Sequence, residues 1–198
     1  MTTTYLTDVR NKVIVDLSNV ALGTRWSNTE LDAAAARALR EFSDAFPYRV
    51  STEIAVSAGV RSYDLSTAGA GALSFRGPAI VQVECPYDVT TLPERNFCTW
   101  RVFDNTLYVD TDTAPTAGQK IRVFWNNIHT LSESVRTYNP DDEDMLVILA
   151  AAYALVARAA SAVNAVNVGG GGTPANFINE ASFRRSIWNE FVSRRRAG

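Results

Sequence analysis

Hydrophobic positions in the first fifty residues repeat at helical spacing. In residues 6–20, apolar side chains recur every three or four positions, which places them on one stripe of a helix. A second helix is predicted after Ser27, because Ser27 and Glu30 have the spacing of a capping box. Pro47 ends it, since proline disfavours helical geometry in the residue before it. The chain therefore opens with two helices, each with one apolar face.

From residue 48 the period changes from helical to two. Apolar and polar side chains alternate from Val50 onward, and this pattern predicts short strands up to residue 126. Asp104 and Asn105 separate two such runs and are typical of a tight hairpin turn. Residues 67–77 are small and glycine-rich, so we expect a loop there. The segment predicts five or six strands that form a small sheet with one covered face.

The last third returns to helix. Asn139 followed by Pro140 is typical of a helix start, and the acidic residues 141–144 suit the positive end of the helix dipole. The helix is alanine-rich and apolar on most faces from residue 145 to residue 166, so we expect protein on nearly every side. A glycine run then predicts a flexible hinge before a final helix that begins near residue 174. The hinge consists of Gly169, Gly170, Gly171 and Gly172.

These patterns predict an α+β protein. Its core is a bundle of about four helices, with a small antiparallel β-sheet insert between the second and third helices. The predicted parts are residues 1–47, the N-terminal helical part of the core; 48–130, the β insert; 131–168, the core helix that completes the bundle; and 169–198, the glycine hinge with a C-terminal docking helix.

Composition narrows the class of protein. The chain has 198 residues, 46% of them hydrophobic and 20% charged, as expected of a soluble domain with a real core. The net charge of −2 argues against a surface built wholly for DNA or anionic lipid. The apolar run 145–157 is too short to span a bilayer, and the N-terminus lacks signal-peptide features. Cys85 and Cys98 do not make a disulfide framework, which favours a reducing compartment.

Few residues are suited to catalysis or metal binding. His129 is the one histidine, and no nucleophile motif accompanies it. The acidic run 141–144 lacks the spacing of a calcium loop, and one histidine with two scattered cysteines gives no zinc pattern. The glycine run has no lysine and follows a helix, unlike a phosphate-binding loop. We expect no catalytic residue, no metal and no cofactor.

The C-terminal helix carries the best candidate surface. It mixes arginine with aromatic side chains, a combination that protein interfaces favour. An exposed docking arm and an ordinary packed helix with a basic tail both fit this pattern. The candidate interface residues are Phe177, Arg184, Arg185, Trp188, Phe191, Arg194, Arg195 and Arg196.

Three segments together resemble a known family. They are W-S-N-T-E-L at residues 26–31, F-P-Y at 46–48, and N-P-D-D-E-D-M-L-V-I-L-A-A-A-Y at 139–153. With the order of helices and strands, they resemble the head–tail connector, or adaptor, proteins of tailed bacteriophages. The resemblance covers most of the chain and rests on architecture and composition rather than on a catalytic signature.

The resemblance implies a structural virion protein of the neck, assembled in the host cytoplasm. Such proteins form a homo-oligomeric ring of about twelve copies under the portal protein, closed by one repeated contact. The ring extends the DNA channel and offers a docking surface to tail or neck proteins. Duplex DNA passes through the lumen without sequence recognition, and no membrane is involved. The β insert would project towards the tail, and the C-terminal arm would reach the portal or a neighbouring copy.

Three other interpretations stay open. The chain could be a tail-completion or neck protein of the next ring. It could be a small nucleic-acid-binding regulator that uses the arginine-rich C-terminal arm, with binding that weakens steeply as salt rises. It could also be an enzyme with a dispersed site in the β insert.

Overall fold

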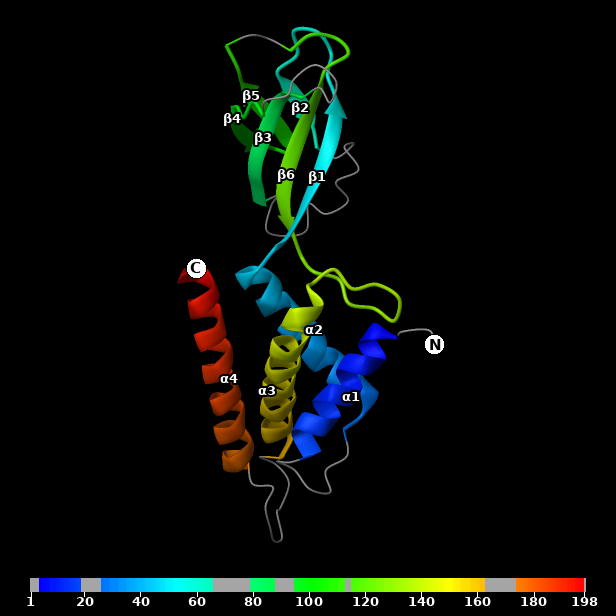
Figure 1. Ribbon diagram of the computed structural model, residues 1–198, viewed down its shortest axis with the longest axis vertical. Coiled ribbons are helices and arrows are strands. Elements are labelled where there is room, and N and C mark those ends of the chain that lie inside the picture. The colour runs from blue at the N-terminus through cyan, green and yellow to red at the C-terminus, as the bar shows by residue number, and fades with distance from the viewer. Residues whose placement is uncertain are drawn as a thin grey trace. The chain divides into compact units, whose positions relative to one another are not determined.

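The protein is mixed α+β and divides into two compact units. The computed structural model describes residues 4–18, 26–65, 79–87, 95–112, 115–162 and 174–197. One unit, the helical unit, comprises residues 1–47 and 128–198, and the other, the β unit, comprises residues 48–127 (Figure 1). The glycine hinge 169–172 and the expected loop 67–77 lie outside the described residues.

The first two helices form as the sequence pattern predicts. Helix α1 spans Tyr5–Ser18 and buries the stripe Val9, Val13 and Leu17. Helix α2 spans Asn28–Ala45. Its capping box is confirmed, because the backbone N–H of Glu30 donates to Ser27 Oγ at 3.2 Å and the Ser27 N–H donates to Glu30 Oε2 at 2.8 Å.

The apolar helix of the last third lies at the centre of the helical unit. A short 3-10 turn, η1 (Pro140–Asp142), leads into α3 (Glu143–Ala162), and Asn139 caps the turn as predicted. Helix α3 packs against α1, α2 and α4 (Pro174–Ala197). Figure 1 shows α3 and α4 side by side and running in opposite directions. The α3 side chains Leu146, Leu149 and Leu155 are fully buried.

The segment Pro140–Ser161 has the length and apolar composition of a membrane-spanning helix, and half of it is buried inside the protein. Its covering helices account for that burial. Buried side chains of α1, α2 and α4 join those of α3 in one hydrophobic cluster. The segment is therefore the core helix of the helical unit.

The β unit contains two three-stranded antiparallel sheets instead of the one sheet that we expected. In the first sheet the central strand β6 pairs with β1 and β3, and in the second β5 pairs with β2 and β4. The strands are β1 (Tyr48–Ala55), β2 (Ser62–Asp64), β3 (Ala79–Tyr87), β4 (Thr99–Phe103), β5 (Thr106–Asp110) and β6 (Lys120–Asn127).

The two sheets share one hydrophobic core. Val83 and Val123 of the first sheet and Leu107 and Val109 of the second belong to the same buried cluster. A small sheet has one apolar face that must be covered, and no helix lies within this unit among the described residues. The second sheet supplies the cover, which is why the strands split into two layers.

The β4–β5 turn offers a test of the hairpin. Asp104 and Asn105 both have positive φ, at 46° and 57°, as a tight hairpin turn requires. Asn105→Val should lower the free energy of unfolding by about 1 kcal/mol, because a β-branched residue disfavours this backbone conformation. Urea unfolding followed by tryptophan fluorescence measures the change. Asn105→Gly is the control and should match or exceed the wild type; equal stability of both variants would contradict the turn assignment.

Candidate assembly surfaces

The C-terminal helix is packed into the helical unit. Phe177, Ala181, Arg184 and Trp188 of α4 are buried. Of the two interpretations that the sequence left open, the burial of Phe177, Arg184 and Trp188 favours the packed helix over the exposed docking arm. The physical reason is α3, whose apolar faces need cover on the side that α1 and α2 leave open. An interface role for the exposed candidates on α4 stays a prediction.

An aromatic cluster joins α4 to the end of α2. The Trp188 ring lies 5.9 Å from Phe42 and 5.8 Å from Phe191, between ring centroids. Phe46 lies 5.6 Å from Phe191 in an edge-on arrangement. Trp188 and Phe191 share one face, as their spacing predicts, but this face points inward to α2.

Arg184 links α4 to α1. Its Nε donates to Asp16 Oδ2 at 2.8 Å, and its Nη1 donates to Glu180 Oε2 at 2.8 Å. Burial alone would lower the pKa of Arg184, but the two carboxylates outweigh it and raise the pKa. A buried arginine held by two acids acts as a structural clamp.

Arg185 links α4 to α2 and α3. Its Nη2 donates to both carboxylate oxygens of Glu41, at 2.9 Å and 3.2 Å. The hydroxyl of Tyr153 on α3 donates to the same Glu41 carboxylate. Arg184 and Arg185 are neighbours in sequence, yet they reach towards different helices because one residue step turns a helix by about 100°.

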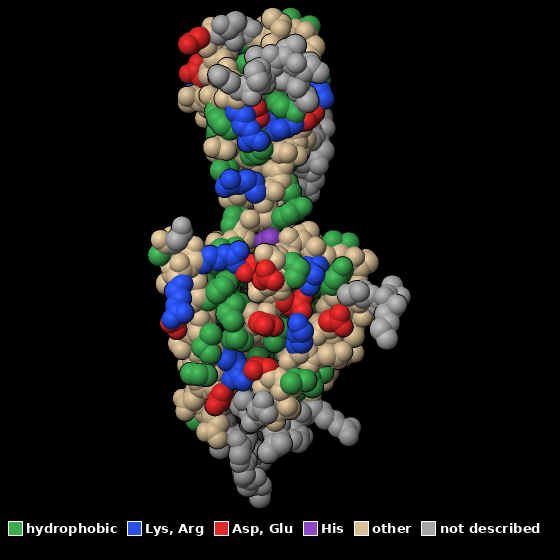
Figure 2. Space-filling view, viewed as in Figure 1, with side chains coloured by type: hydrophobic (Ala, Val, Ile, Leu, Met, Phe, Trp, Pro, Cys, Tyr) green, Lys and Arg blue, Asp and Glu red, His purple; other side chains and the backbone are tan. Residues whose placement is uncertain are grey.

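The arginines at the end of α4 have different surroundings. Arg195 pairs with Asp142 of η1, and its guanidinium lies 4.9 Å from the Phe46 ring centre. Arg194 pairs with Glu190 one turn earlier. Arg196 has no ion pair with any residue that the structure describes. Figure 2 shows basic and acidic side chains side by side over the helical unit. Most of the basic charge predicted for this arm is thus neutralised within the chain.

A hollow lies between the ends of α2 and α4. Its volume is about 400 Å³. Apolar side chains of Ala45, Trp188 and Val192 line part of it, and Asp44 and Arg196 lie at its polar part. The remaining lining residues are Glu41, Asn189 and Ser193. A partly apolar hollow edged by opposite charges is suited to docking a protein side chain.

The start of α3 carries a buried carboxylate with three partners. Glu143, whose side chain is 9% exposed, accepts from Lys12 Nζ at 2.6 Å and from Arg136 Nη1 at 2.7 Å. The hydroxyl of Tyr138 donates to it at 3.3 Å. Burial alone would raise the pKa of Glu143, but the hydrogen bonds from Lys12 and Arg136 outweigh it and lower the pKa. The acidic run is therefore a structural contact as well as a helix cap.

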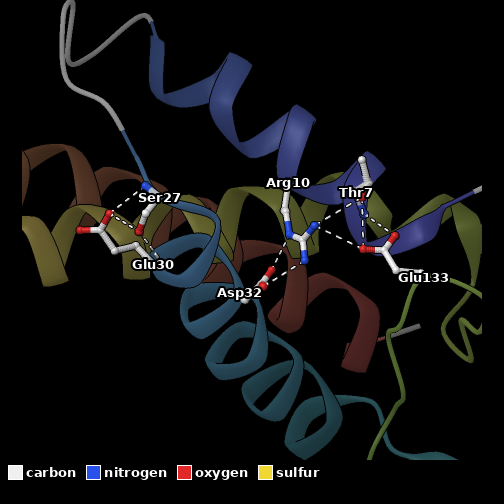
Figure 3. A network of polar contacts seen from close by, with 6 residues as sticks. All are labelled: Thr7, Arg10, Ser27, Glu30, Asp32 and Glu133. Atoms are coloured by element: carbon white, nitrogen blue, oxygen red, sulfur yellow. Dashed lines mark hydrogen bonds and ion pairs between the residues drawn. The ribbon is translucent and has the colours of Figure 1, made fainter.

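Arg10 ties α1 to α2 in the same way (Figure 3). Its Nη2 donates to Asp32 Oδ2 at 3.0 Å, and its Nη1 donates to Glu133 Oε1 at 3.3 Å. Thr7 donates to the same Glu133 carboxylate at 3.1 Å. Each helix that covers α3 thus carries a charged contact to a neighbouring segment.

His129 has a structural environment. Its Nε2 lies 2.8 Å from the carbonyl oxygen of Phe46, so Nε2 carries the proton and donates. Nδ1 then accepts from the hydroxyl of Thr137 at 3.2 Å. The backbone N–H of His129 donates to Ser43 Oγ at 2.9 Å. His129 therefore connects the segment that follows β6 to the C-terminal end of α2 through hydrogen bonds.

The two cysteines meet in the β unit, which the sequence did not indicate. Cys85 is buried, and the backbone contacts Cys85–Asn96 and Cys98–Val83 bring the two thiols to one face. A hydrogen bond between the thiols raises the pKa of Cys85 and lowers that of Cys98. Among the described residues, no group of three or more His, Cys, Asp and Glu side chains is placed to hold a metal ion.

Comparison with known proteins identifies no family for this chain. No family model matches the chain, and no curated protein matches it. Among solved structures, the chain is similar to one from the "Neck of empty GTA particle computed with C6 symmetry". The two are 12% identical, the match covers 91% of this chain and 89% of the other, and the TM-score is 0.27.

Removal of α4 tests whether this helix belongs to the core. A chain that ends after residue 173 loses Phe177 and Trp188 and uncovers one side of α3, so it should aggregate or unfold. Sedimentation and circular dichroism measure this. A chain that ends after Ser193 is the control, because it keeps the buried part of α4, and it should stay folded. A soluble, folded product of the first truncation would show instead that α4 is a separate arm.

Replacement of Glu143 tests whether its ion pairs with Lys12 and Arg136 stabilise the fold. Glu143→Gln should lower the free energy of unfolding at neutral pH by about 1–2 kcal/mol, because Lys12 and Arg136 lose a charged partner. A carboxylate with a lowered folded pKa stabilises the fold above its unfolded pKa of about 4.3, and this stabilisation disappears as the pH falls through the folded pKa. The difference between variant and wild type should therefore shrink in acid.

Chemical unfolding at a series of pH values measures that difference. Asp144→Asn is the matched control, because Asp144 is 82% exposed and lies 3.9 Å from Lys12. It should change the free energy of unfolding by less than about 0.5 kcal/mol. A difference in the free energy of unfolding between Glu143→Gln and wild type that stays constant down to acid pH would contradict the proposed role of the Glu143 charge.

Proposed function

We propose that this chain is a structural protein of the neck of a tailed bacteriophage or phage-like particle. In this proposal it acts as the head–tail connector, or adaptor: a ring of copies lies between the portal and the tail, extends the DNA channel and offers the tail a docking surface. The role is structural rather than catalytic. The ring belongs to the virion and assembles in the host cytoplasm.

One observation carries the proposal. The helical unit is built from both ends of the chain, and the β unit is inserted between α2 and α3. This order of elements is the one on which the resemblance to connector proteins rests, and it leaves α2 and α4 with a docking hollow at their ends.

The arginine-rich C-terminus supports an assembly role over nucleic-acid binding. A regulator that binds DNA through this arm needs unpaired arginines to displace counterions. Arg194 and Arg195 instead pair with Glu190 and Asp142 within the helical unit. Replacement of Arg194, Arg195 and Arg196 by Ala should therefore leave DNA binding weak and unchanged.

The copy number of this chain in purified particles tests the proposed ring. Quantitative mass spectrometry, with the portal protein as internal standard, should give about one copy per portal subunit, because stacked closed rings tend to match their symmetry. A capsid-only particle that lacks the neck is the control. Absence of the chain from complete particles would refute the proposal, and a ratio well below one would favour a tail-completion protein of a later ring.

A further inference from the structure

Most charged side chains of the helical unit pair within the chain, and the exceptions form two groups. Arg10, Arg184, Arg185 and Arg195 all have carboxylate partners. Within the described part of the helical unit, the charged side chains without an ion-pair partner are Asp8, Arg37, Arg40, Asp44, Asp141 and Arg196. Such residues contribute little to the fold and are free to meet another molecule.

The first group comprises Arg196, which lines the hollow between α2 and α4, and two arginines of α2, and we name it the arginine face. It consists of Arg37, Arg40 and Arg196. Arg37 lies one turn before Glu41, and Arg40 lies one turn before Asp44; both acids line the hollow. Glu41 is already neutralised by Arg185, and Asp44 offsets one arginine. The face keeps an excess of positive charge beside an apolar floor of Ala45, Trp188 and Val192.

The second group lies where α1 meets the start of α3, and we name it the aspartate face. It consists of Asp8 and Asp141, which have no ion-pair partner in the described chain, and of the exposed Asp144, which pairs with Lys12. Asp144 contacts Lys12 at 3.9 Å, but Lys12 is closer to buried Glu143, at 2.6 Å. Asp8 lies one turn before Lys12 on α1. The hydrogen bond with Glu143 is the main cause that raises the pKa of Lys12, and the charges of Glu143, Asp144 and Asp8 add to it. Val15, which is 66% exposed, lies one turn after Lys12 and adds an apolar side chain to this face.

The two faces are formed by different elements: the aspartate face by α1, η1 and α3, and the arginine face by α2 and α4. Asp144 contacts Lys12 of α1, whereas Tyr153 contacts Glu41 of α2 and the guanidinium of Arg185 on α4. Asp144 and Tyr153 are nine residues apart, and at about 100° per residue they point in opposite directions from the helix axis.

We propose that the aspartate face of one copy binds the arginine face of the next copy. The stripe of Asp8 and Val15 would enter the hollow between α2 and α4, with the aspartates near Arg37, Arg40 and Arg196. Two different, complementary faces of one chain make a head-to-tail contact, which repeats around a ring when its rotation closes. The proposal rests on the ring of the proposed function and names the surfaces that form it. Because the two faces of one chain carry opposite charge, a second copy of the chain is the partner that fits the hollow.

Charge reversal with rescue tests the contact. Arg37→Glu with Arg40→Glu makes the arginine face acidic, and Asp8→Arg with Asp144→Arg makes the aspartate face basic. Each double variant alone should self-associate at least about tenfold more weakly than wild type, measured by sedimentation velocity. An equimolar mixture should regain association, because each reversed face meets a complementary face on the other variant. Higher salt should weaken the wild-type contact.

The control reverses two exposed arginines of the β unit, Arg49→Glu with Arg61→Glu, and should leave self-association unchanged. Association of both face variants at wild-type strength, or failure of the mixture to recover while each variant stays folded by circular dichroism, would overturn the inference. So would a wild type that stays monomeric at every concentration. The copy number of the wild-type chain in particles does not depend on which faces form the contact. That measurement therefore still tests the proposed function if the charge-reversal experiment fails.

Discussion

The apolar surface of α3 has to be covered by other helices, and the arrangement of the rest of the helical unit follows from this constraint. A helix with so few polar side chains is not stable in water until other elements surround it. Helices α1 and α2 come from the start of the chain and α4 from its end, and all three bury side chains against α3. Both ends of the chain therefore belong to one unit, and the strands between α2 and α3 fold as an insert.

At the edges of the apolar core, arginine side chains form ion pairs that connect the helices around α3 to one another. Arg10 joins α1 to α2, Arg184 joins α4 to α1, and Arg185 joins α4 to α2. An arginine suits these places because its long side chain covers apolar surface while its planar head group meets a carboxylate. These contacts add specificity to a cover that apolar packing alone would leave free to rotate or slide. Arginine is far more frequent than lysine in this sequence, and these contacts give several of the arginines a structural role in the helical unit.

The sequence predicted the elements better than it predicted their surroundings. Periodicity and capping located α1, α2 and the start of α3, since these signals depend on neighbouring residues only. The split into two sheets was missed, because the pairing of β5 with β2 and β4 depends on contacts between distant segments. For the same reason the sequence could not show that Trp188 meets Phe42, or that Arg184 meets Asp16 far away in the chain. A mixed arginine and aromatic face is compatible with exposure and with burial until its partner helix is known.

The charged side chains of the helical unit fall into two classes, those paired within the fold and those without an ion-pair partner. A side chain such as Arg184, which is buried and has two carboxylates at 2.8 Å, is held by the fold and is not accessible to a partner. A side chain such as Arg37 or Asp8 has no such commitment in the described chain, and its loss costs the fold little. Substitution of these residues can change a contact with another molecule at little cost in stability. The proposed contacts between copies are therefore best sought among charges that the fold leaves unpaired, rather than in the longest run of one sign.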